Sequence, residues 1–146
     1  MSSFVFAPVD DAVDTKRHAI AAFGRILVAL LFILSGWSKL TGGVGNVAGY
    51  IASKGLPMAE VLAWLTVALE LGGGILIAIG YQTRLVSLLF FLWLIPTTFV
   101  FHKFWGITDA AQAQSQFNNF FKNVSIMGAF ALLFAFGPGA YSLDKR

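Results

Sequence analysis

Residues 61–83 read VLAWLTVALELGGGILIAIGYQT, an apolar run interrupted near its middle by one carboxylate, Glu70. The run is long enough to cross a bilayer, because a hydrocarbon core of about 30 Å needs roughly 20 apolar residues. An ionisable side chain in that medium costs roughly 2.5–3.5 kcal/mol on insertion scales, so it usually faces a bundle interior or a functional cavity. The stretch therefore predicts a membrane-spanning helix whose carboxylate needs a partner.

The chain as a whole has the composition of an integral membrane protein. Of its 146 residues, 58% are hydrophobic and 12% are charged, and the mean hydropathy is +0.77. Soluble domains carry about 25% charged residues. The basic residues are scattered rather than clustered, which argues against a nucleic-acid partner. The sequence contains no cysteine, which excludes disulfides, thiolate metal ligands and the chemistry of a quinone-linked thiol oxidase.

Four apolar runs are predicted to span the bilayer, at residues 21–40, 59–80, 85–104 and 117–136. The short link at 80–84 requires the second and third spans to form an antiparallel hairpin. We therefore expect an all-α membrane protein, an antiparallel bundle of four transmembrane helices formed by a single domain at 21–146. Residues 1–20 are expected to be a poorly ordered cytoplasmic segment. The polar stretch 108–119 is predicted to be a loop or an interfacial helix.

The distribution of basic residues predicts the topology. Six lie on the side of the termini (Lys16, Arg17, Arg25, Arg84, Lys145 and Arg146), and four lie on the other (Lys39, Lys54, Lys103 and Lys122). The positive-inside rule then places both termini in the cytoplasm. A signal peptide ending near Gly36 is a weaker alternative, because acidic residues precede the first span and cleavage would leave an odd number of spans.

Several ionisable side chains are predicted to share one depth. At ~1.5 Å per residue from the inner ends of the spans, Lys39, Glu70 and Lys122 lie ~21–22 Å up and His102 lies ~27 Å up. Small residues accompany Lys39 and Glu70 on their helix faces, where membrane helices approach closely. We predict a polar cavity open toward the outer side. Its candidate ligand-binding residues are Lys39, Glu70, His102, Lys122 and Asn123.

Simpler interpretations of these side chains remain open. A pair between Lys39 and Glu70 would also satisfy both charges if it only fixed helix register. His102 fits a wetted interfacial histidine, and Lys122 fits a side chain that snorkels to the surface. Trp93 is interpreted as a packing or lipid-facing residue, with a position lining a pocket as the alternative. The two histidines of the chain are expected at opposite ends of the bilayer, so no metal or haem site is predicted.

The chain also resembles a known family. The resemblance runs from about Phe23 to Asp144, and it rests on the order of several short motifs. These are Arg25, SGWSKL at 35–40, GLP at 55–57, ELGGG at 70–74, GYQTR at 80–84, Lys122-Asn123 and GPGAYSLD at 137–144. Together they are similar to the DoxX family. The resemblance implies a bacterial inner-membrane protein of four helices, and some members of the family are associated with membrane redox complexes.

Three classes of function follow. The leading hypothesis is a redox-linked membrane subunit that contacts a quinone through the polar site. It would not be catalytic alone, and it would work with a membrane or periplasmic oxidoreductase partner, because no cysteine, haem or flavin motif is visible. The alternatives are a small-solute carrier or binding protein, and a structural subunit whose outer loops, 41–58 and 106–116, recruit a partner. In each case the protein is expected to contact the lipid bilayer, and a homo-oligomer is compatible with all three classes of function.

Overall fold

The structure, a computed structural model, describes residues 11–145, and its regular elements there are helical. They are α1 (Asp11–Thr41), α2 (Val44–Ser53), α3 (Ala59–Val67), η1 (Ala68–Gly73), α4 (Gly74–Ile79), α5 (Thr83–Phe101) and α6 (Ala110–Phe136). The π-helical turns of η1 join α3 to α4, so these three elements form one continuous span. Within the described part of the chain, four helices are long and apolar enough to cross a membrane. The predicted fold class and the four spans are confirmed, whereas the side on which the termini lie stays a prediction.

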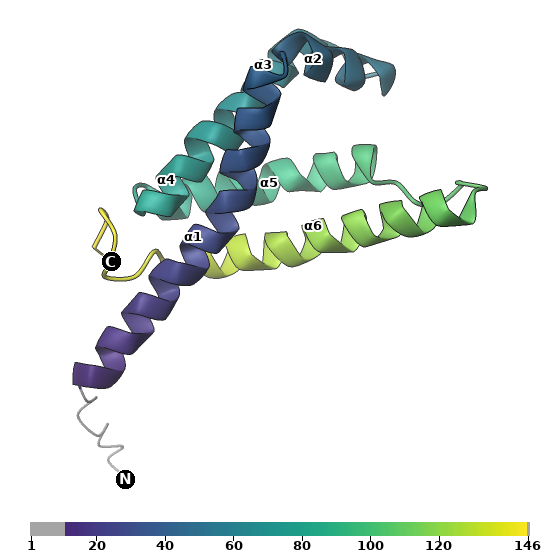
Figure 1. Ribbon diagram of the computed structural model, residues 1–146. Coiled ribbons are helices and arrows are strands. Elements are labelled where there is room, and N and C mark those ends of the chain that lie inside the picture. Colours follow the sequence, from purple (N-terminus) through teal and green to yellow (C-terminus); the bar gives the residue numbers. More distant parts are fainter. Residues whose placement is uncertain (1–10, 146) are drawn as a thin grey trace, which may run out of the picture.

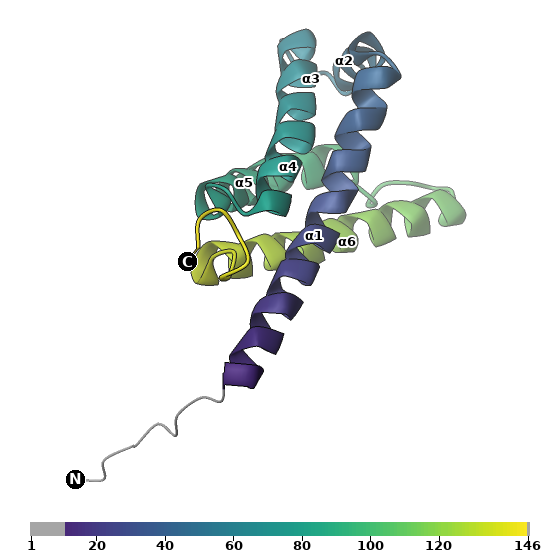
Figure 2. The same ribbon diagram turned by 60° about the vertical axis from the view of Figure 1, so that its left-hand side comes forward.

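The four spans are arranged as two diverging pairs. Helix α1 packs along η1 and α4, and α5 packs along α6 (Figure 1). The pairs meet near the middle of α1 and separate toward the end that carries α2, as the second view also shows (Figure 2). The ends at which the pairs separate therefore lie away from the two chain termini.

An aromatic cluster holds the two pairs together where they meet. Phe32 of α1, Phe90 of α5 and Phe130 of α6 are 5%, 0% and 0% exposed. Their ring centroids lie 4.5 Å apart for Phe32 and Phe90, 5.5 Å for Phe32 and Phe130, and 4.6 Å for Phe90 and Phe130. Such ring pairs contribute about 0.5–1.5 kcal/mol each beyond their burial. The cluster therefore holds the two helix pairs together at the point from which they diverge.

Helix boundaries differ from the predicted ones at several ends. Helix α1 begins at Asp11 rather than near residue 21, so the second half of the expected N-terminal segment is helical; residues 1–10 lie outside the described residues. Helix α5 ends at Phe101 instead of 104. Helix α6 begins at Ala110, because the Asp109 side chain accepts a hydrogen bond from the Gln112 amide at 2.7 Å and caps the helix. Most of the polar stretch 108–119 is thus the first part of a membrane-length helix.

Helix α2 is an element that the sequence analysis did not predict. It forms inside the glycine-containing loop 41–58 and begins after Gly43, whose φ of 100° favours glycine. Val44 and Ile51 are buried against Ala63 and Val67 of α3. Burial of these side chains outweighs the low helix propensity of the local glycines, so tertiary packing makes this helix.

The end of the bundle near the termini is closed by the C-terminal segment. Arg25 of α1 is 4% exposed and donates hydrogen bonds to the carbonyl oxygens of Ala78 (3.2 and 3.3 Å), Pro138 (2.6 Å) and Tyr141 (2.8 Å). The Asp144 carboxylate accepts from the amides of Gln82 (3.0 Å) and Thr83 (2.9 Å), which begin α5. One guanidinium and one carboxylate therefore attach the segment after α6 to three different elements.

Candidate functional site

Glu70 and Lys39 form an ion pair inside the bundle. The Lys39 Nζ lies 2.6 Å from Glu70 Oε2 and donates a second hydrogen bond to Ser35 Oγ, also at 2.6 Å. The Glu70 side chain is 6% exposed and that of Lys39 is 31% exposed. The carboxylate is thus satisfied at depth by a residue of another span, as its position required, while the amine keeps access to open space.

Local backbone geometry brings these two side chains together. Glu70 belongs to η1, and π-helical turns inside helices often occur at functional sites. Gly36 of α1 faces this turn so closely that a Cβ added there would lie 2.5 Å from the Leu71 amide nitrogen. Gly74 makes a similar approach to Ile33. The predicted close approach through small residues is confirmed at these two glycines, and it allows α1 and η1 to place the ion pair.

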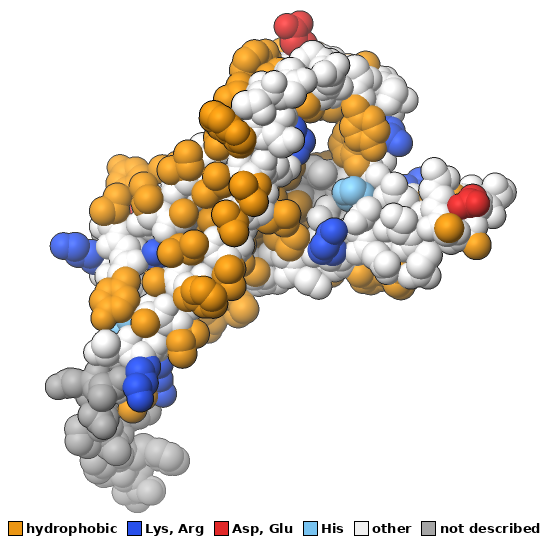
Figure 3. Space-filling model, in the orientation of Figure 1, with side chains coloured by type: hydrophobic (Ala, Val, Ile, Leu, Met, Phe, Trp, Pro, Cys, Tyr) orange, Lys and Arg blue, Asp and Glu red, His pale blue; other side chains and the backbone are white. Residues whose placement is uncertain are grey.

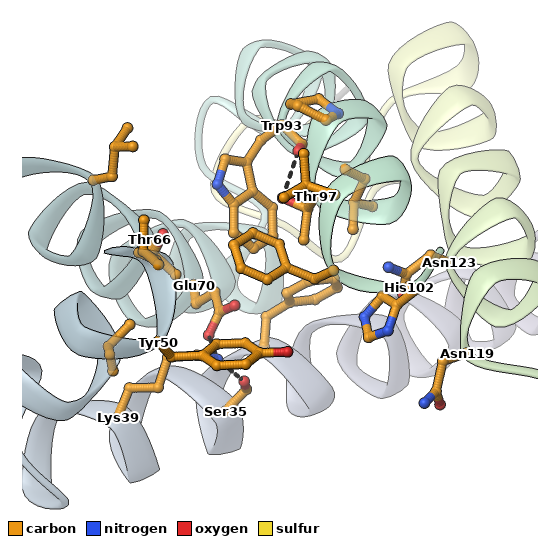
Figure 4. Close-up of a pocket in the computed structure, with 18 of the residues that line it drawn as sticks. Ser35, Lys39, Tyr50, Thr66, Glu70, Trp93, Thr97, His102, Asn119 and Asn123 are labelled. Atoms are coloured by element: carbon orange, nitrogen blue, oxygen red, sulfur yellow. Dashed lines mark hydrogen bonds and ion pairs between the residues drawn. The ribbon is translucent and has the colours of Figure 1, made fainter. Parts of the chain in front are cut away.

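A cavity of about 590 Å³ lies beside the ion pair, between the two helix pairs. Side chains of α1, α2, α3, η1, α5 and α6 line it, together with Leu56 and His102 from the segments that follow α2 and α5. Figure 4 shows a close-up of this cavity. All five candidate residues from the sequence line it: Lys39, Glu70, His102, Lys122 and Asn123. Most of the remaining lining is apolar, including Leu31, Val47, Leu62, Leu94, Val100 and Ile126.

The polar side chains of the cavity divide into two groups. Lys39, Ser35 and Glu70 form one group, and His102, Asn119 and Asn123 lie toward the other helix pair (Figure 4). His102 Nδ1 lies 3.1 Å from Gln116 Oε1. Asn123 donates to Thr98 Oγ1 at 3.2 Å, and Thr98 is fully buried. The structure therefore brings the predicted residues to one cavity, but as two polar ends rather than one cluster.

Aromatic side chains line the space between these polar ends. Trp93 and Tyr50 both border the cavity, and the Tyr50 ring of α2 lies 5.3 Å from that of Phe101 of α5. For Trp93 the structure shows the pocket-lining position, which was the alternative to a packing or lipid-facing role. Tyr50 was missed because the helix that carries it was not predicted.

The cavity carries polar groups at two ends and an apolar, aromatic surface between them. An amine and a carboxylate are available at one end, and amides and an imidazole at the other. Among residues 11–145 no three histidine, aspartate or glutamate side chains converge as a metal site would require.

Comparison with known proteins places the chain in a family. The DoxX family profile matches residues 20–103, which end before α6. The chain is 42% identical over 130 residues to inner membrane protein YphA of Escherichia coli (strain K12), covering 89% of this chain and 91% of that protein. It is 38% identical over 121 residues to inner membrane protein YqjF of the same organism, covering 83% and 86%.

A third relative covers only part of the chain. CatD of Bacillus subtilis (strain 168), named as a candidate oxidoreductase, is 38% identical over 71 residues, which cover 49% of this chain and 51% of that protein. No solved structure matches the chain. The profile and the two inner membrane relatives agree with the four spans, and the chain therefore belongs to the DoxX family of multi-pass inner-membrane proteins.

Proposed function

We propose that this protein is a membrane subunit of a redox system and that it binds a quinone in the cavity beside Lys39 and Glu70. The observation that carries the proposal is the pairing of two polar ends across an apolar, aromatic-lined space inside a membrane bundle. Ligand sites are typically apolar pockets with a few placed polar groups that fix orientation. Ionisable residues at membrane depth mark such pathways or sites.

The lining matches the shape and chemistry of a quinone head group. A quinone ring is flat and carries carbonyl oxygens on opposite edges, and both oxygens accept hydrogen bonds. The Lys39 amine would donate to one oxygen, and the side-chain amide of Asn119 or the imidazole of His102 to the other. Trp93 and Tyr50 offer aromatic faces for the ring, and the aliphatic side chains offer a surface for the tail.

The chain would supply protons and orientation rather than electrons. Reduction of a quinone to a quinol takes two electrons and two protons. Glu70 and His102 are groups able to exchange protons near the two polar ends. The electrons would come from a partner oxidoreductase, since this sequence has no cysteine. The name of CatD gives the family a further link to redox chemistry. We therefore propose that the protein is not catalytic alone.

A quinone titration tests this proposal. A variant that keeps Trp93 alone, with Trp37, Trp64 and Trp105 replaced by phenylalanine, would be reconstituted in lipid nanodiscs. Short-chain ubiquinone and menaquinone should quench its fluorescence saturably. Glu70→Gln should weaken binding at least about tenfold, which corresponds to about 1.4 kcal/mol. Glu60→Gln is the matched control, because Glu60 is exposed and does not line this cavity.

Two results would contradict the proposal. One is the absence of saturable quenching with either quinone. The other is an equal response in Glu70→Gln and Glu60→Gln, which would show that the quinone reaches Trp93 from the bilayer without using the ion pair. In that case the ion pair would be left with the role of fixing helix register.

A further inference from the structure

The cavity contains a second basic side chain, and the carboxylate of the ion pair does not neutralise its charge. Lys122 of α6 is exposed and lines the cavity, as do Lys39 and Glu70. Glu70 lies 2.6 Å from Lys39 and balances that charge. Within residues 11–145, Lys122 has no carboxylate in ion-pairing distance. The cavity wall therefore carries one positive charge without a counter-charge.

Lys122 lies among polar side chains on the cavity side of its helix. It lies near the middle of α6, a helix of 27 residues, with Asn119 and Asn123 beside it on the cavity side. A lysine in a membrane-spanning helix is unfavourable in hydrocarbon and is accommodated where water or an anion reaches it. The cavity provides the space through which an anion would approach.

The charged side chains at the surface around the cavity are also mostly basic. Basic side chains and a histidine are visible around the hollow between the helix pairs, whereas the acidic side chains in that view lie at the outer tips of the molecule (Figure 3). A concave site with low-dielectric walls concentrates the field of such charges. The field of these basic side chains would attract a negatively charged group to the hollow.

We infer that the cavity binds an acidic amphiphile, whose carboxylate or phosphate lies at Lys122 and whose hydrocarbon chain follows the apolar lining. The amide of Asn119 would donate a further hydrogen bond to the acidic group. The side chains of Leu31, Val100 and Ile126 would contact the chain. This inference does not depend on quinone binding, because it rests on Lys122 and on the apolar wall.

The test compares an acid with its uncharged ester. The variant with Trp93 alone, in nanodiscs of phosphatidylcholine, would be titrated with 9,10-dibromostearic acid and with its methyl ester, since bromine quenches tryptophan at short range. The acid should bind about tenfold more tightly than the ester. Lys122→Met should reduce this preference to about one and leave ester binding unchanged, which shows that the variant is folded.

Lys103→Met is the matched control, because Lys103 is an exposed lysine that does not line the cavity. It should keep the full preference for the acid. Dibrominated phosphatidic acid distinguishes the two acidic groups. If this lipid binds more tightly than the fatty acid, the site is assigned to a phosphate. If it binds more weakly, the site is assigned to a carboxylate. The inference is overturned if acid and ester bind equally in the parent variant. It is also overturned if Lys103→Met lowers the preference as much as Lys122→Met.

Discussion

Helix α1 carries two buried or half-buried cations in very different surroundings. Arg25 is surrounded by the carbonyl oxygens of three residues from other segments, and its side chain has almost no exposed surface. Lys39 has one carboxylate and one hydroxyl as partners, its side chain is 31% exposed, and it lines the cavity. The planar guanidinium suits the first role, because its five donors satisfy several acceptors at fixed angles. The flexible ammonium suits the second, because it can exchange a partner.

The difference distinguishes a cation with a structural role from a cation at the candidate site within one helix. The Arg25 site is filled by the protein's own backbone, so it has no capacity for a ligand. The Lys39 site keeps an ionisable pair next to open space, which is expensive in a membrane unless it is used. Substitution of Lys39 should accordingly change ligand binding, whereas substitution of Arg25 should change the assembly of the fold.

The largest effect is expected from Arg25→Met. The substitution leaves the carbonyl oxygens of Ala78, Pro138 and Tyr141 without their donor, and each unsatisfied buried acceptor costs about 1–3 kcal/mol. Thermal unfolding in mild detergent should show a loss of roughly 3 kcal/mol or more. Limited proteolysis should also cleave the segment after α6, which has lost its attachment to α1.

Arg84→Met is the control for this variant. Arg84 is exposed and donates to the carbonyl oxygens of Phe134 and Ala135 at the end of α6. Water can replace the arginine there, so the expected loss is below about 1 kcal/mol. Equal losses in the two variants would remove the distinction between a structural cation and an accessible one.

The sequence was sufficient for the spans and for the shared level of Lys39 and Glu70 on their helices. Apolar runs of membrane length and the rise of a helix predicted four crossings, and they predicted that Lys39 and Glu70 would be at similar heights. Both predictions need only local information. The lining of one cavity by all five candidate residues followed from the same reasoning, although their role in binding stays a prediction.

Features that depend on distant contacts were not predictable. Arg25 was interpreted as a residue of the positive-inside pattern and of the family resemblance, and its structural role was not predicted, because its acceptors come from segments more than fifty positions away in the sequence. Helix α2 needed the burial of Val44 and Ile51 against α3 to overcome its glycines. The division of the polar residues into two ends followed from the divergence of the helix pairs, for which hydropathy carries no signal.

An intermediate effect is expected from Gly36→Ala, which tests how the ion pair is positioned. The added methyl group would meet the backbone of Leu71, so α1 and η1 would have to separate. Overpacking of this kind costs about 1–3 kcal/mol. Unfolding temperature should fall, and quinone affinity should fall with it, because Lys39 would move relative to Glu70.

Gly24→Ala is the matched control on the same helix. Gly24 is exposed and has no neighbouring atom within 4 Å of an added Cβ. Alanine should therefore be neutral or stabilising there, by up to about 1 kcal/mol from helix propensity. A Gly36→Ala protein as stable as Gly24→Ala would mean that the two helices are not held at the observed separation.

The smallest change in stability is expected when both members of the ion pair are replaced, in Lys39→Met with Glu70→Gln. Lys39→Met alone leaves a carboxylate without its partner, whereas the double variant has no unpaired charge, and replacing a buried pair by neutral residues is often close to neutral. The unfolding temperature should thus return most of the way to that of the parent protein. Quinone quenching of Trp93 should nevertheless remain weak, because the donor and the proton-exchanging group are both gone. A double variant that regains stability and quinone affinity together would assign the pair to helix register alone, and Lys39 would then belong with Arg25 as a structural cation.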